Sequence, residues 1–175
     1  MLKKITLATT LALASVGAMA ESQRGSSAVD FFARYTTSDS SDTIMAGIGW
    51  SHYFTSKFAL GVKVFEMYTE SGYGTTYNEM TAFGVGPKAT FSFAPNSPVS
   101  PYVFAGVNVF SSETYSGATS STSDSSSTQY DIGAGVEFFI GENASTYVEL
   151  EQLDTISGDE MGSQTNVNGG IKVYF

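Results

Sequence analysis

The sequence predicts an all-β protein, an eight-stranded antiparallel up-and-down transmembrane β-barrel, and three observations predict it. After residue 20, apolar residues alternate with polar residues or glycines along most of the chain, which is the period of a β-strand. The segments that alternate are joined by short and long connections in turn. Charged residues make up 14% of the chain, against about 25% in an ordinary soluble domain.

The first twenty residues have the pattern of a secretory signal peptide. Lys3 and Lys4 precede an apolar run over residues 5–16, and Ala18-Met19-Ala20 then gives a cleavage pattern ahead of Glu21. The run is too short to span a bilayer, and no later stretch approaches the ~20 apolar residues of a transmembrane helix. We therefore expect a cleaved signal over 1–20 and a barrel over 21–175 that enters the membrane as strands.

Eight segments carry the alternation. We place strands at 27–36, 43–54, 58–69, 79–93, 101–111, 129–140, 144–154 and 164–175. The last is the clearest, because Val167, Gly169, Ile171, Val173 and Phe175 share one face.

Pro87 in the fourth strand and Asn108 in the fifth depart from the simple alternation. Pro87 has no amide hydrogen, so one ladder bond is lost and we expect a bulge there. In the fifth strand we place Asn108 inside with Tyr102, Phe104 and Phe110, and the valines outside.

The connections differ in length in a regular way. Those at 55–57, 94–100 and 141–143 are short or compact, whereas those at 37–42, 70–78, 112–128 and 155–163 are longer and polar. The segment 112–128 is nearly pure Ser, Thr and Gly with two acids, and we expect a low-complexity loop. Short turns at one end and long loops at the other are typical of a transmembrane barrel.

The composition of the two strand faces decides between a membrane barrel and a soluble one. The polar face is rich in glycine, whereas the other face carries Val, Ile, Leu, Ala and Phe with hardly a charge. A soluble barrel such as a lipocalin needs the polar face outside, and this one is too small to coat an exterior. Aromatic residues gather near the strand ends: Trp50, Phe54, Phe58, Phe91, Phe93, Phe138 and Phe175 towards the short turns, and Tyr35, Tyr68 and Tyr130 towards the long loops.

With these features the chain resembles the OmpA/OmpX-type small outer-membrane barrels of Gram-negative bacteria, over all of 21–175. The resemblance implies a monomer in the cell outer membrane, with extracellular long loops and periplasmic termini. It also implies contact with outer-membrane lipid and lipopolysaccharide. The last strand is similar to the signal that the outer-membrane assembly machinery recognises, which points to Ile171, Val173 and Phe175.

Charged side chains on the inward face need partners, because an unpaired buried charge costs several kcal/mol. The alternation places nine of them in the bore: Asp30, Arg34, Lys63, Lys88, Asp131, Glu137, Glu149, Glu151 and Lys172. We expect Lys63 and Lys88 to face Glu149 and Glu151 across the bore, and Lys172 to neighbour the seventh strand. A structural salt-bridge network is one reading, and a switchable gate for small ions is the other.

Little in the sequence supports catalysis or a cofactor. The absence of Cys and the single His exclude thiolate sites and two-histidine metal sites. Some eight-stranded barrels modify lipid A with a His-Ser pair, but Ser51 and His52 are neighbours on a strand and point to opposite faces. We expect His52 to pack at the interface beside Trp50, and we expect no catalytic residue, metal or cofactor. Glu149 and Glu151 are not accessible to a sugar inside a narrow barrel, so they are not a glycosidase pair.

The acidic character of the chain bears on its partners. A formal net charge of −9 and a pI near 4.4 argue against nucleic acid. The long connections carry acids and no basic residue: Asp39, Asp42, Glu70, Glu113, Asp124, Asp159 and Glu160. A solvated, repelling surface is the simple interpretation, and loose divalent-cation binding is the alternative.

The sequence thus predicts a non-enzymatic outer-membrane barrel with a structural or surface-exposed role. A narrow gated pore is the second hypothesis and a lipid-modifying enzyme is the third.

Overall fold

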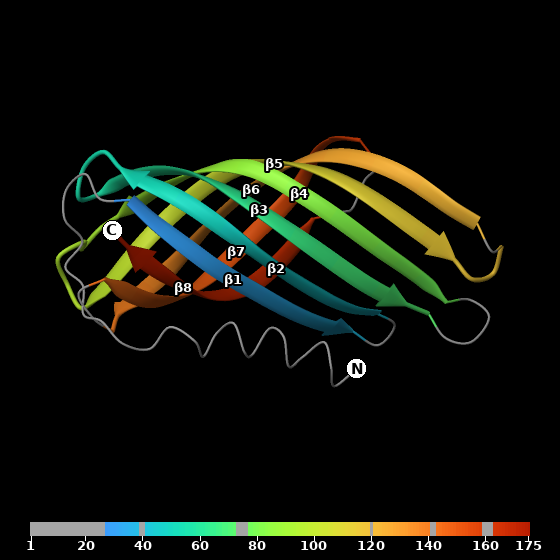
Figure 1. Ribbon diagram of the computed structural model, residues 1–175, viewed down its shortest axis with the longest axis horizontal. Helices are drawn as coiled ribbons and strands as arrows, with labels where there is room; N and C mark the ends of the chain where they lie inside the picture. Colours follow the sequence, from blue (N-terminus) through green and yellow to red (C-terminus); the bar gives the residue numbers. More distant parts are fainter. Residues whose placement is uncertain (1–26, 39–40, 73–76, 120, 141–142, 159–162) are drawn as a thin grey trace.

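The computed structural model describes residues 27–38, 41–72, 77–119, 121–140, 143–158 and 163–175. Eight strands make up nearly all of this: β1 (Ser27–Ser38), β2 (Ser41–Tyr53), β3 (Phe58–Ser71), β4 (Asn78–Ser92), β5 (Val99–Ser116), β6 (Ser121–Phe139), β7 (Ala144–Gly158) and β8 (Gln164–Tyr174). Each strand pairs antiparallel with the next, and β1 pairs with β8 to close the barrel (Figure 1). The predicted fold class and all eight strands are confirmed. The expected signal peptide at 1–20 lies outside the described residues.

Within the described residues, no helix has both the length and the apolar character needed to cross a membrane.

The segment 112–128 was predicted to be a loop, and this prediction is wrong. β5 continues to Ser116 and β6 starts again at Ser121, with pairs from Ser111↔Ser126 to Ser116↔Ser121. Ser and Thr side chains are polar on both faces, so they give no alternation, yet their backbone pairs normally. The hydroxyls add to the ladder, since Ser112 Oγ lies 2.8 Å from Ser125 Oγ. In Figure 1 this hairpin projects at the end of the barrel opposite the C-terminus.

The other long connections are also shorter than predicted. β3 runs to Ser71 and β7 to Gly158, so pairing continues past the apolar part of each strand. Gly72 and Gly158 then adopt φ values of 85° and 99°, a left-handed conformation that glycine adopts at no steric cost.

Pro87 causes no bulge, contrary to the prediction. Val85↔Val109 and Lys88↔Gly106 belong to one continuous register on either side of it. A proline removes one donor without adding a residue, so the register survives the missing bond. The register shift of the barrel lies instead in β6–β7, between Thr128 and Gln129.

The faces of the strands are as predicted, with apolar side chains outside. In β5, Asn108 is fully buried with Tyr102 and Phe104, whereas Val109 is 54% exposed. In β8, Val167 is 62% exposed while Asn166 is buried. An apolar exterior of this kind suits a lipid solvent, in which a closed barrel satisfies every backbone polar group.

Aromatic side chains border the apolar outer surface at both edges of the barrel. Trp50, Phe54, Phe91, Phe93 and Phe175 are exposed at the short-turn edge. Tyr35 and Tyr130 are exposed towards the other edge. This agrees with the two interfacial girdles of a transmembrane barrel.

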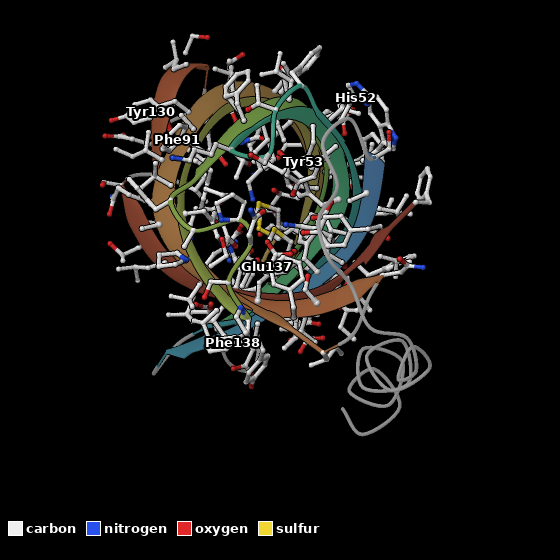
Figure 2. All side chains as sticks on the ribbon, turned by 90° about the vertical axis from the view of Figure 1, so that its left-hand side faces the viewer. His52, Tyr53, Phe91, Tyr130, Glu137 and Phe138 are labelled. Atoms are coloured by element: carbon white, nitrogen blue, oxygen red, sulfur yellow. The ribbon has the colours of Figure 1, made fainter. Side chains whose placement is uncertain are left out.

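Apolar layers fill the bore at both ends. Met45, Phe65, Met67, Ala82 and Phe110 form a buried cluster towards the long connections. Ala28, Tyr53, Ala59 and Tyr174 form another at the short-turn end, with Phe139 against it. Figure 2, which looks along the barrel from the short-turn end, shows side chains filling the interior, with Tyr53 and Glu137 inside and His52 and Phe138 outside.

Candidate functional site in the barrel bore

Between the two apolar layers the bore holds the nine charged residues that the alternation placed there. Seven are buried, and Asp30 and Lys88 are half-buried. Charges withdrawn from water are stable only when each is paired or hydrogen-bonded. Their contacts divide into three groups, one centred on a lysine and two centred on a carboxylate.

The first group is centred on Lys63 of β3. Its Nζ lies 2.7 Å from Oδ2 of Asp131 in β6 and 3.2 Å from Oε1 of Glu151 in β7. Nη1 of Arg34, from β1, lies 3.5 Å from the other oxygen of Glu151. Four strands from different sides of the barrel are therefore joined by two cations and two carboxylates.

Two asparagines complete the hydrogen bonding of this group. Asn108 donates from Nδ2 to Oδ1 of Asp131 at 3.0 Å. Asn168 donates to Oε2 of Glu151 at 2.9 Å. Both carboxylate oxygens of Asp131 and both of Glu151 thus accept a hydrogen bond, which offsets the cost of burying these ions.

The second group is centred on Glu149 of β7. Lys88 of β4 lies 2.5 Å from its Oε1, and the Tyr102 hydroxyl donates to the same atom at 2.9 Å. The Lys88 ammonium also lies 4.0 Å from the centroid of the Phe104 ring, a cation–π distance.

The third group is centred on Glu137 of β6, nearer the short-turn end. Lys172 Nζ lies 3.3 Å from its Oε2, and the hydroxyls of Ser145 and Tyr174 donate to its Oε1. Asp30 accepts a bond of 3.2 Å from the Tyr147 hydroxyl.

The structure brings all nine predicted residues into the bore with the expected neighbours, and it adds two ion partners that were not expected. Lys63 does contact Glu151 and Lys88 contacts Glu149, yet the shortest contact of Lys63 is to Asp131. Lys172 neighbours β7 as expected, through its ladder partner Ser145, and its ion partner is Glu137 of β6.

Several members of these groups were missed because they carry no charge. Tyr147, Ser145 and Asn168 each bind a bore carboxylate. The alternation already puts them on the inward face, so a search for inward hydroxyl and amide groups would have found them.

Among the described residues, two small cavities lie within the bore, and Lys63 lines both. One, towards the long connections, is also lined by Arg34, Asn108 and Gln129, and the other by Tyr53 and Lys172. Each has a volume of about 20 Å³, room for about one water molecule. At these two places the bore is therefore packed closely enough to leave room for about one water molecule each.

His52 takes part in none of this, as it lies on the outer face. Its ring stacks on Trp50 with centroids 6.2 Å apart and meets Phe54 edge-on at 5.0 Å. Its Nδ1 lies 3.1 Å from the Ser27 hydroxyl. Ser51 points into the barrel, so the two neighbours do not meet.

The three residues of the expected assembly signal lie on the outward row of β8. Ile171 and Val173 precede Phe175, whose side chain is 70% exposed. The Phe175 backbone exchanges two hydrogen bonds of 2.9 Å with Ser27, so this residue closes the ladder between β8 and β1.

The long-connection end is acidic on its outward face. Asp42, Glu70 and Glu79 are neighbours in the ladder of β2, β3 and β4, and Tyr68 donates to Glu70 at 2.7 Å and to Glu79 at 2.5 Å. A hydrogen bond to Glu79 also raises the pKa of Tyr77, just before β4. Among the described residues, no group of three His, Asp or Glu side chains is arranged to hold a metal ion. Asp39, Asp159 and Glu160 lie outside those residues.

Comparison with solved structures gives small barrels over most of the chain. The N-terminal β-barrel domain of Pseudomonas aeruginosa OprF matches at 20% identity and a TM-score of 0.55, covering 87% of this chain and 98% of that one. Neisserial surface protein A matches at 17% identity and a TM-score of 0.61, covering 86% and 96%. Ail of Yersinia pestis, in complex with the heparin analogue sucrose octasulfate, matches at 14% identity and a TM-score of 0.61. The match covers 87% of this chain and 100% of Ail.

These identities establish the fold alone. A search among curated proteins gives no significant match. The family model described as the outer membrane protein beta-barrel domain, however, matches residues 6–175. With its closed ladder of eight strands and apolar exterior, the chain belongs to the family of outer membrane β-barrel proteins.

Proposed function

We propose that the protein is a non-enzymatic barrel with a structural or surface-exposed role, and that its ion-pair network closes the bore. The observation that carries this is the pairing of Lys63 with both Asp131 and Glu151 at the centre of the bore. A network that joins strands across the barrel stiffens it and pairs four of the five bore carboxylates with a cation. The apolar layers above and below it restrict water at both ends.

The orientation and the partners belong to the same proposal. Long connections face outward from the cell and both termini face the periplasm, in a monomer surrounded by lipid and lipopolysaccharide. Support comes from the Tyr-rich edge towards the long connections and from the outward row that ends at Phe175, which the assembly machinery would recognise. The described residues at the long-connection end carry no Lys or Arg, so an anionic ligand such as the heparin analogue bound by Ail does not suit this surface.

A narrow gated pore is the second candidate, and the two cavities favour it. Because Lys63 lines both, a movement of this one side chain would join them into a longer path. A lipid-modifying enzyme has weaker support. Ser51 and His52 lie on opposite sides of the barrel wall, and Ser27, whose hydroxyl contacts His52, lies with it at the short-turn edge, which this proposal assigns to the periplasmic side.

Charge reversal at Lys63 tests the closure of the bore. Lys63→Glu would bring a third carboxylate to Asp131 and Glu151, where loss of one partner of a buried pair costs about 3–5 kcal/mol. We expect a lower melting temperature, or water in the bore and cation conductance in planar bilayers. Lys63→Met keeps the bulk and should destabilise less, because a carboxylate can then take up a proton.

Lys57→Glu, in the exposed turn before β3, is the matched control and should change neither measurement. If Lys63→Glu melts and conducts like the wild type, the network does not close the bore. Stepwise conductance of the wild-type protein would instead favour the pore.

A further inference from the structure

Three methionines converge inside the barrel towards the long connections. Met45 of β2 and Met67 of β3 are direct partners in the ladder and are both buried. Met80 of β4 packs against the same cluster, two residues before Ala82, the ladder partner of Met67. Figure 2 shows sulfur atoms, in yellow, within the bore.

We propose that Met45, Met67 and Met80 form a binding site for a soft monovalent cation, Cu(I) or Ag(I). Thioether sulfur is a soft ligand that selects Cu(I) over hard cations. Directly paired residues have Cβ atoms about 4.5–5.5 Å apart, and the unbranched methionine side chain adapts its rotamer readily. Met45 and Met67 can therefore bring their sulfur atoms to one ion, with Met80 as the third ligand.

The surroundings suit a desolvated ion. Met45 and Met67 line the cavity of about 20 Å³, together with the rings of Phe65 and Phe110. This volume holds one water-sized particle. Polar side chains also line this cavity, among them Asn108, Gln129 and Gln164. The thioethers nevertheless give a soft ion the sulfur ligands that a hard, strongly hydrated ion does not prefer.

The charges around the cavity set the affinity. Glu151 lies on its wall, and the bore holds five acidic and four basic side chains, so one added positive charge balances the interior. Two cations act in the other direction, because Lys63 and Arg34 both line the cavity and Nη2 of Arg34 lies 4.0 Å from Sδ of Met67. A cation bound to Met67 must displace this contact, and Arg34 should therefore weaken binding.

The experiment titrates the folded mature protein in detergent micelles with silver nitrate in chloride-free buffer. Calorimetry gives stoichiometry and affinity, and NMR of methionine ε-methyl groups labelled with ¹³C reports which residues bind. We expect one ion per barrel and shifts of the methyl signals assigned to Met45, Met67 and Met80. Met45→Leu or Met67→Leu should weaken binding about tenfold or more, and Met80→Leu should weaken it less.

Two further variants separate this site from other ligands. Arg34→Gln should tighten binding, while Glu151 keeps its contacts with Lys63 and Asn168. His52→Phe removes the one imidazole of the chain and should leave the affinity unchanged. Unshifted methyl signals, or wild-type affinity in both Met45→Leu and Met67→Leu, would overturn the proposal. The test does not depend on whether the bore is closed, since both conductance outcomes leave the three thioethers in place.

Discussion

Single glycines decide which large side chains fit in the bore. A Cβ at Gly84 would lie 2.4 Å from Cζ of Phe65, and one at Gly133 would lie 2.5 Å from Cζ of Phe104. Each ring occupies the space that a side chain would fill if the glycine on the neighbouring strand were a larger residue. The glycine-rich inward face is therefore the counterpart of the aromatic layers.

Gly84→Ala should lower the free energy of unfolding by about 1–3 kcal/mol, the usual cost of overpacking. All three of its nearest contacts are atoms of the Phe65 ring. In a Phe65→Ala background the extra methyl group should therefore cost almost nothing. Urea unfolding of the two single variants and the double variant measures the coupling.

Gly169→Ala provides the control, because its Cβ would meet only the Tyr147 carbonyl oxygen, at 3.8 Å. We expect a stability close to the wild type. Equal costs at Gly84 and Gly169 would show that Phe65 does not press on β4.

At the scale of elements, strands continue wherever the backbone finds a partner, whatever their side chains are. The β5–β6 hairpin is the clearest case, since its outer part pairs fully although both of its faces are polar. Its stability comes from the ladder, and it contributes no side chain to the apolar layers beyond Phe110.

Replacement of residues 112–126 by a four-residue turn should leave the barrel folded. Phe110 and the buried Ser127 are retained, and shortening a connection changes the closure entropy by only about 0.6 kcal/mol per factor of two. Heat-modifiable migration on gels and strand content by circular dichroism check this. Loss of the folded band would mean that the hairpin is needed to nucleate or hold β5 and β6.

Deletion of Phe175 should impair assembly in cells. The residue completes the outward row of β8, and its backbone makes both 2.9 Å bonds to Ser27. The yield of folded protein in the outer membrane is the measurement, with Phe93→Ala as a control for loss of one exposed aromatic side chain. A normal yield without Phe175 would remove the evidence for an assembly signal.

At the scale of the whole molecule, the barrel has an apolar wall and a charged, packed interior. This is the reverse of a soluble domain, and it requires a lipid solvent outside, where an exposed Lys or Arg near the midplane costs about 2–4 kcal/mol. Arg34, Lys63, Lys88 and Lys172 all point inward instead, and Lys57 lies in a turn.

The mature protein should therefore begin at Glu21 and sediment with the outer membrane. N-terminal sequencing and membrane fractionation test this, and unheated samples should migrate differently from boiled ones on gels. Recovery in the soluble periplasmic fraction would contradict a transmembrane barrel.

The amino-acid sequence by itself determined the number of strands, their inward and outward faces and the nine charges of the bore. It could do so because a strand has a period of two, which needs no knowledge of the neighbouring strands. Its failures lie where this period carries little information, as in the Ser- and Thr-rich segment 112–128 and at Pro87, where register depends on the partner strand.

Only the tertiary structure decided which charges meet. Lys63 of β3 contacts Asp131 of β6 and Glu151 of β7, and Lys172 of β8 reaches past its neighbour β7 to Glu137 of β6. Contacts across a bore depend on how far each strand is shifted along the next, and this shift accumulates around the barrel before it closes. The convergence of Met45, Met67 and Met80 has the same origin, because three distant sequence positions come together only through the register of β2, β3 and β4.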